Sequence, residues 1–100
     1  MTTHQRQLVT IVTEAALEHE LVGVFIELGA SGYTITDARG KGSRGIRDAG
    51  WKFGANIRIE VVCSETTATE IASFLQERYY ENYAMIYFTT DVHVLRPEKF

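Results

Sequence analysis

Four short segments of the chain are rich in β-branched and other apolar residues, and this pattern predicts β-strands. The clearest is NIRIEVVC at residues 56–63, in which alternate side chains are apolar, so one face of the strand is expected to be buried. The residues on that face are Ile57, Ile59, Val61 and Cys63. The predicted strands are residues 7–13, 32–36, 56–63 and 83–95.

Two segments between these strands have apolar residues at helical spacing instead. In residues 14–28 they recur every three or four positions, and Gly29 follows as a stop signal. The second helix begins at a cap, either Ser64 or Thr67, and continues to about Tyr80. The order β-α-β-loop-β-α-β predicts a ferredoxin-like α+β fold, a four-stranded antiparallel sheet with two helices on one face.

Both faces of the predicted sheet carry apolar side chains. The first strand contains Leu8, Val9, Ile11 and Val12, and the last contains Met85, Ile86, Tyr87 and Phe88. Two helices can cover only one face, and a sheet whose other face is solvated should alternate cleanly between apolar and polar residues. We therefore expect the second face to be buried against other copies of the chain in a homo-oligomer.

The segment from Gly29 to Phe53 is polar, rich in glycine and cationic. Between Arg39 and Lys52 it holds five of the ten Lys and Arg residues and one acid, Asp48, so this stretch carries +4 while the remainder of the chain carries −7. Glycine lets the backbone approach a ligand closely, and Arg can bind phosphate oxygens in pairs. The segment therefore predicts a site for a phosphate-bearing ligand, with a solvated loop that binds nothing as the alternative.

The remaining features restrict the classes of function. One hundred residues, 45% of them hydrophobic, predict a single domain spanning residues 1–100, and the net charge of −3 disfavours a nucleic-acid-binding protein. Cys63 is the single cysteine, the three histidines lack metal-ligand spacing, and no Ser-His-Asp set can be placed, so neither a metal nor a catalytic residue is expected. Without a signal sequence or an apolar stretch of spanning length, a cytoplasmic protein without membrane insertion is expected.

The GKGSRG sequence at residues 40–45 matches the pattern G-x-G-x-x-G. A Rossmann fold would need a helix directly after it, and the sequence that follows has no helical period. It also lacks the Gly-Lys-Ser/Thr ending of a Walker A motif. The backbone amides, the Lys41 ammonium, the Ser43 hydroxyl and the nearby arginines could nevertheless surround a phosphate.

Motifs along nearly the whole chain match a known family. They are VTIVTE in the first strand, GASGYTIT, GKGSRGIR, NIRIEVVC and the final YAMIYFTTDVHVL. With them the chain resembles the PII signalling-protein superfamily, and more closely its PII-like carbon-sensing branch, whose members accompany bicarbonate transporters or carboxysomes. The resemblance implies a compact homotrimer with nucleotide clefts between neighbouring subunits, and a loop from about Asp37 to Ala55, the T-loop, which reports the ligand to a partner.

The resemblance also implies ligands and site residues. The ligands would be adenine nucleotides (AMP, ADP, cyclic AMP or ATP), with bicarbonate as a candidate second effector, and the protein target a bicarbonate transporter or a carboxysome-related protein. The cleft would be lined by Ser31, Gly32, Tyr33 and Thr34, with Glu60 and Val62 near the adenine and Ile86 and Phe88 at the wall. The phosphate would be held by Lys41, Gly42, Ser43, Arg44 and Arg47.

Two departures from the family limit what carries over. The glycine-rich B-loop of classical PII proteins is replaced by the short turn at residues 81–84, which has no lysine, so phosphate binding would rest on the base of the T-loop. The final residues, RPEKF, contain no cysteine, so the redox switch of some carbon-sensing relatives is not expected.

Three functions remain. The first is a non-enzymatic, nucleotide-responsive regulatory trimer, which accounts for the cationic loop, the acidic remainder and the two-faced sheet together. The second is a ferredoxin-like module that binds RNA or single strands, which would need aromatic residues exposed on the central strands. The third is a small phosphoryl-transfer enzyme, for which Asp37 and Asp48 would be the candidate metal ligands.

Overall fold

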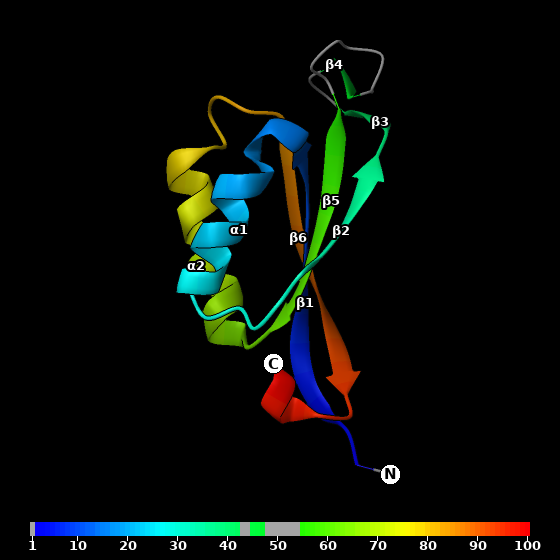
Figure 1. The fold of residues 1–100 in the computed structure, drawn as a ribbon, viewed down its shortest axis with the longest axis vertical. Coiled ribbons are helices and arrows are strands. Elements are labelled where there is room, and N and C mark those ends of the chain that lie inside the picture. The colour runs from blue at the N-terminus through cyan, green and yellow to red at the C-terminus, as the bar shows by residue number, and fades with distance from the viewer. Residues whose placement is uncertain (1, 43–44, 48–54) are drawn as a thin grey trace.

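The computed structural model describes residues 2–42, 45–47 and 55–100. The main strands are β1 (His4–Glu14), β2 (Thr34–Ala38), β5 (Asn56–Cys63) and β6 (Met85–Val94), and the helices are α1 (Glu18–Glu27) and α2 (Glu65–Arg78). The strands form one antiparallel sheet in the order β2-β5-β1-β6, and both helices lie on the same face of it (Figure 1). The predicted ferredoxin-like fold is confirmed.

The bounds of three strands differ from the sequence prediction. The first begins earlier, at His4, because even its polar end pairs with β6, where His4 lies opposite Val94. The second begins later, at Thr34, which is the first residue of that segment to pair with β5, opposite Glu60. The last also begins later than predicted, because the Tyr83 amide donates a hydrogen bond to the carbonyl of Tyr79 at 3.0 Å and belongs to the preceding turn.

The structure also defines how each helix begins, which the spacing of apolar residues did not show. The predicted helix 14–28 opens with a 3₁₀ turn, η1 (Ala15–Leu17), before the α-helix begins. Of the two candidate caps for α2, Ser64 is the N-cap, and its hydroxyl oxygen accepts a hydrogen bond from the Thr67 amide at 3.1 Å. Among the described residues, no helix combines the length and apolar character needed to cross a membrane.

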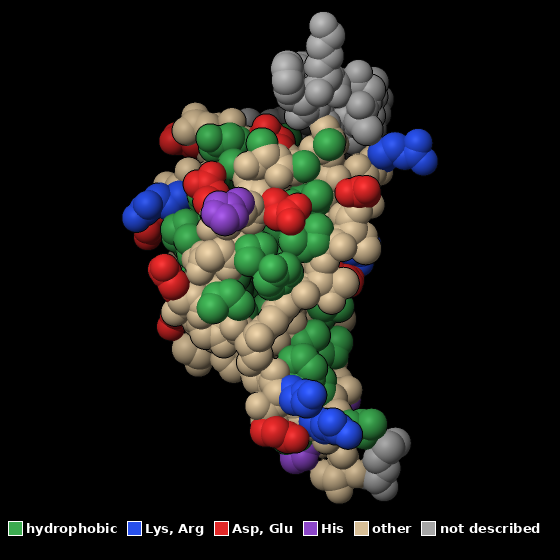
Figure 2. Space-filling model, in the orientation of Figure 1, with side chains coloured by type: hydrophobic (Ala, Val, Ile, Leu, Met, Phe, Trp, Pro, Cys, Tyr) green, Lys and Arg blue, Asp and Glu red, His purple; other side chains and the backbone are tan. Residues whose placement is uncertain are grey.

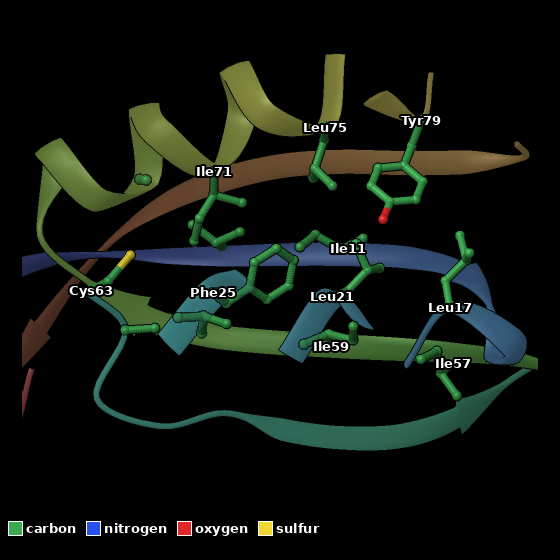
Figure 3. Close-up of a cluster of buried hydrophobic side chains, with 14 residues drawn as sticks. Ile11, Leu17, Leu21, Phe25, Ile57, Ile59, Cys63, Ile71, Leu75 and Tyr79 are labelled. Carbon is green, nitrogen blue, oxygen red and sulfur yellow. The ribbon is translucent and has the colours of Figure 1, made fainter. Parts of the chain in front are cut away.

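The hydrophobic core lies between the helices and the sheet (Figure 3). Its largest fully buried side chains come from both helices and from the two central strands: Ile11, Leu21, Phe25, Ile59, Ile71 and Leu75. The predicted alternation of β5 is confirmed, since residues 57, 59, 61 and 63 are all at most 2% exposed. Burial raises the pKa of the Cys63 thiol, which packs as a small apolar side chain.

The face of the sheet opposite α1 and α2 is here called the outer face. Strand alternation directs Leu8 and Val12 of β1 to this face, where both are half-buried. On β6, Ile86 and Phe88 occupy the same face and remain 40% and 44% exposed. The sheet therefore presents apolar side chains on a face that neither helix covers, as the sequence predicted.

A small hairpin stands apart from the main sheet, where the sequence analysis expected an irregular loop. Strand β3 (Gly40–Gly42) pairs antiparallel with β4 (Gly45–Arg47) in a separate two-stranded sheet (Figure 1). Each strand has three residues and three of the six paired residues are glycine, so no alternation of side chains marks the hairpin in the sequence. Residues 43–44 and 48–54, which include Trp51 and Phe53, lie outside the described residues.

Gly29, which follows α1, is expected to tolerate no side chain. Its φ of 112° is a backbone conformation that favours glycine, and an added Cβ would lie 2.9 Å from Oγ1 of Thr67. That hydroxyl donates a hydrogen bond to the Leu28 carbonyl, so it cannot move freely. Gly29→Ala is therefore expected to lower the free energy of unfolding by about 1–3 kcal/mol, measured by urea denaturation.

Gly23 provides the matched control for this substitution. It lies inside α1, and an added Cβ would meet no atom within 4 Å. Gly23→Ala is expected to raise the free energy of unfolding by about 0.5–1 kcal/mol, because alanine restricts the unfolded chain. Equal effects of the two substitutions would contradict the role assigned to the Gly29 conformation.

Candidate functional site

A cleft of about 280 Å³ lies where the segment preceding β2 meets the outer face of the sheet. Its lining residues come from four parts of the chain: Leu8, Ser31, Gly32, Tyr33, Thr34, Glu60, Val62, Lys99 and Phe100. The last two lie at and after a C-terminal 3₁₀ turn, η2 (Pro97–Lys99). Figure 2 shows hydrophobic side chains directly above a group of Lys and Arg side chains at this end of the molecule.

The sheet register explains the floor of the cleft. Glu60 and Val62 alternate with the buried residues of β5 and therefore face outward. Thr34 of β2 lies opposite Glu60, and Leu8 of β1 lies opposite Val62. The floor thus joins an apolar part, formed by Leu8 and Val62, to a polar part formed by a hydroxyl and a carboxylate.

The rim of the cleft is formed by the connection between α1 and β2. Gly32 lies in this connection, and a Cβ placed on it would meet nothing within 4 Å. A ligand can therefore approach the Gly32 backbone closely. The adjacent Tyr33 is 47% exposed and also borders a second hollow, of about 300 Å³, over η1 and the start of α1.

Charges of both signs lie in or beside the cleft. The Arg58 Nη2 atom is 3.2 Å from Oε2 of Glu60, so the carboxylate in the cleft is paired along its own strand. Lys99 adds a cation from η2. The position of η2 is set in part by Arg6, whose Nη2 donates a hydrogen bond to the carbonyl of Pro97 at 3.2 Å. A ligand with an apolar ring and a negatively charged group would find partners for both in this cleft.

Six of the residues that the sequence assigned to a cleft line this one: Ser31, Gly32, Tyr33, Thr34, Glu60 and Val62. Sequence reasoning missed Leu8, Lys99 and Phe100. The two-faced pattern of the first strand was a signal for Leu8. No local signal marks the other two, because they reach the cleft through the Arg6 contact, which joins the two ends of the chain.

Two further predicted site residues, Ile86 and Phe88, do not line this cleft of the single chain. Ile86 and Phe88 lie on the outer face of β6, and β1 separates that strand from β5. Three of the predicted phosphate-binding residues, Lys41, Gly42 and Arg47, belong to the β3–β4 hairpin. The other two, Ser43 and Arg44, lie outside the described residues.

The base from which the hairpin arises contains a further hollow, of about 390 Å³. It is lined by Asp37, Ala38, Arg39, Ala55 and Asn56, at the end of β2 and the start of β5. Thr34 and Glu60 of the cleft lie farther along the same two strands, so the strands run from the cleft to the base of the cationic segment.

The turn between α2 and β6 is filled by aromatic packing. The ring of Tyr79 lies 5.6 Å from that of Phe74 and 5.5 Å from that of Tyr83, measured between centroids. Burial and a hydrogen bond with Glu20 raise the pKa of the Tyr79 hydroxyl. Tyr79 belongs to the core and Tyr83 packs against it. In the part of the chain that the structure describes, no three His, Cys, Asp or Glu residues cluster as metal ligands.

Comparison with known proteins identifies the family. Residues 6–99 match the family described as nitrogen regulatory protein P-II. The chain belongs to the P-II family. This confirms the resemblance that the sequence motifs indicated, and it places the cleft and the β3–β4 hairpin on a P-II domain.

Solved structures agree with this assignment. A candidate PII-like signalling protein from Thermus thermophilus is 50% identical over 100% of this P-II chain and 99% of its own, with a TM-score of 0.86. CPII, a nitrogen regulatory PII-like protein from Thiomonas intermedia bound to ADP, AMP and bicarbonate, is 26% identical over 99% of this chain and 96% of its own, with a TM-score of 0.90. A second CPII structure, bound to ADP and bicarbonate, is 26% identical over 99% of this chain and 97% of its own, with a TM-score of 0.89.

Proposed function

We propose that this P-II protein is a non-enzymatic regulator that binds an adenine nucleotide in the outer-face cleft. The observation that carries the proposal is that two separate segments of the chain, one with Gly32 and Thr34 and one with Glu60 and Val62, line one cleft. Both CPII structures, which have the same fold, are bound to ADP and one of them also to AMP, and this supports adenine nucleotides as the ligand class.

Each part of the cleft has a role in this proposal. The apolar floor of Leu8 and Val62 receives the adenine ring, and the Glu60 carboxylate accepts a hydrogen bond from a ligand donor. The Gly32 backbone approaches the ligand without steric hindrance. The phosphate extends along β2 and β5 toward the base of the cationic segment, where Lys41, Gly42, Ser43, Arg44 and Arg47 would hold it.

The proposed assembly is a homotrimer with the nucleotide clefts between neighbouring subunits. The uncovered apolar residues of the outer face, above all Ile86 and Phe88, support burial against other copies. A neighbouring subunit seated there would enlarge the cleft and enclose the ligand, which the single chain leaves open on one side.

The proposed output is the T-loop, residues 37–55, which would change its contacts with a protein target when the cleft is occupied. Bicarbonate is the proposed second effector, supported by its presence in the CPII structures. The target would act in inorganic-carbon transport or metabolism, as a bicarbonate transporter or a carboxysome-related protein.

The outer face disfavours an RNA-binding function. The two central strands present Leu8, Thr10 and Val12 from β1, and Arg58, Glu60 and Val62 from β5. None of these six residues is aromatic, whereas base stacking on a sheet of this fold uses aromatic residues of the central strands.

Calorimetric titration with AMP, ADP, cyclic AMP and ATP, each with and without bicarbonate, tests the proposed function. AMP, ADP or cyclic AMP is expected to bind at least as tightly as ATP, because the turn between α2 and β6 offers no lysine to a γ-phosphate, whose added charge must be desolvated. Tenfold tighter binding of ATP, about 1.4 kcal/mol, would contradict this ranking. No binding of any of the four would refute the proposal itself.

The contribution of the cationic segment can be measured at Arg44 and Arg47. Replacing either with Ala is expected to weaken ADP binding by about 1.5–3 kcal/mol, the range for a hydrogen bond to a charged group. Arg78→Ala is the control, because that side chain lies over the Phe74 ring on α2, on the opposite face of the sheet. Unchanged affinity in both loop variants would remove this segment from the site.

A further inference from the structure

The Arg58–Glu60 ion pair has no assigned role, although one of its members lines the cleft. The two side chains are 47% and 35% exposed, and the pair joins neighbours on one strand. An ion pair this exposed typically contributes about 0–1 kcal/mol or less to folding. The ion pair therefore contributes little to the stability of the protein. Because Glu60 lines the cleft, a role of the pair in ligand binding is the alternative.

A nucleotide and Glu60 carry charge of the same sign. A carboxylate in the cleft repels a phosphate, and the repulsion grows when the ligand displaces water and lowers the effective dielectric constant. The residues opposite Glu60 on the neighbouring strands are Thr34 and Thr10, which are neutral and cannot offset its charge. The charge that lies against the Glu60 carboxylate is the guanidinium of Arg58, at 3.2 Å.

Resting on the proposed nucleotide function, we propose that Arg58 is the counter-ion of Glu60, which allows an anionic ligand to share the cleft with that carboxylate. Arg58 is then a positioning residue: it acts through Glu60, holding the carboxylate in place and neutralising it, and need not touch the ligand. Its neighbours across the strands, Thr36 and Val12, are also uncharged, so the guanidinium is directed along β5 to Glu60.

This role differs measurably from a direct contact between Arg58 and the phosphate. If Arg58 binds the phosphate itself, its removal weakens binding whether or not residue 60 is charged. If it acts by neutralising Glu60, its removal matters only while the carboxylate is present. A double-mutant cycle on the full-length protein separates the two cases.

The cycle uses ADP as the probe and measures its dissociation constant by calorimetry for the wild type, R58Q, E60Q and the double variant. We expect R58Q to weaken ADP binding about tenfold in the presence of Glu60. The same substitution is expected to change the affinity less than twofold in the E60Q background. R58K, which keeps the charge, is expected to stay within threefold of wild type.

Two controls accompany the cycle. R78Q removes one positive charge from α2, on the other face of the sheet, and is expected to leave ADP binding unchanged. Raising the salt concentration is expected to reduce the loss of ADP affinity caused by R58Q, because salt screens the repulsion between Glu60 and the phosphate. Normal far-UV circular dichroism of each variant shows that it is folded.

The outcomes are distinct. Wild-type protein that does not bind ADP refutes the proposed function. If the wild type binds ADP and R58Q binds it equally well, only the role of Arg58 is refuted. If R58Q lowers the ADP affinity equally in the wild-type and the E60Q backgrounds, Arg58 contacts the phosphate directly. That result also overturns the inference.

Discussion

Gly32→Phe is expected to abolish adenine-nucleotide binding and to leave the fold intact. Gly32 lies at the rim of the cleft, and an added Cβ would meet no atom within 4 Å, so a larger side chain can be accommodated without disturbing the core. A phenylalanine ring at the rim would then obstruct the cleft, which has a volume of about 280 Å³. We expect at least a hundredfold loss of ADP affinity in calorimetry, which corresponds to about 2.7 kcal/mol.

Gly23→Phe is the control for this substitution. Gly23 also has space around an added Cβ, but it lies on α1, away from the cleft. Both variants are expected to keep the thermal stability of the wild type within a few degrees. Nucleotide binding that survives Gly32→Phe would show that the ligand lies elsewhere.

Phe88→Asp is expected to dissociate the proposed trimer. Phe88 is 44% exposed on the outer face of β6, beside Ile86, so an aspartate there is tolerated in the isolated chain but would be buried without a partner in the assembly. Burying an unpaired carboxylate costs several kcal/mol, and this cost opposes association of the subunits. Light scattering of wild type and variant at micromolar concentration measures the effect, with a monomer of 11.3 kDa expected for the variant.

Ile26→Asp provides the matched comparison for the outer face. Ile26 is 46% exposed, close to the value for Phe88, but it lies on α1 on the other side of the molecule. The trimer is expected to persist in this variant. If wild-type protein is monomeric, or if both variants dissociate it equally, the outer face is not the subunit interface.

The local sequence determined much of this fold because each core element has a clear period. The alternation from Ile57 to Cys63 and the helical spacing of Leu21 and Phe25 each identify one buried face, and the structure confirms both. The β3–β4 hairpin was missed for the opposite reason: strands of three residues, half of them glycine, have no side-chain pattern.

The site was predicted only where a family motif and a sheet register coincide. Thr34 and Glu60 pair across β2 and β5, so motif residues from both segments share one cleft. Ile86 was assigned to the cleft wall; within one chain β1 lies between β5 and β6, so a place for Ile86 at a cleft between neighbouring subunits stays a prediction. Lys99 reaches the cleft through the contact of Arg6 with Pro97, which joins residues at opposite ends of the chain and leaves no local signal.

The place of β1 in the sheet affects how the protein folds. Its partners on β6 are far away along the chain, from Thr13 with Met85 to His4 with Val94. Closing such long loops lowers the entropy of the chain before the β1–β6 contacts form, so this domain is expected to fold more slowly than a helical bundle of the same length. During synthesis, the edge of β1 that β6 will cover stays unpaired until the last strand has left the ribosome. A chain that stalls before Met85 would therefore expose an apolar strand edge that other chains can join.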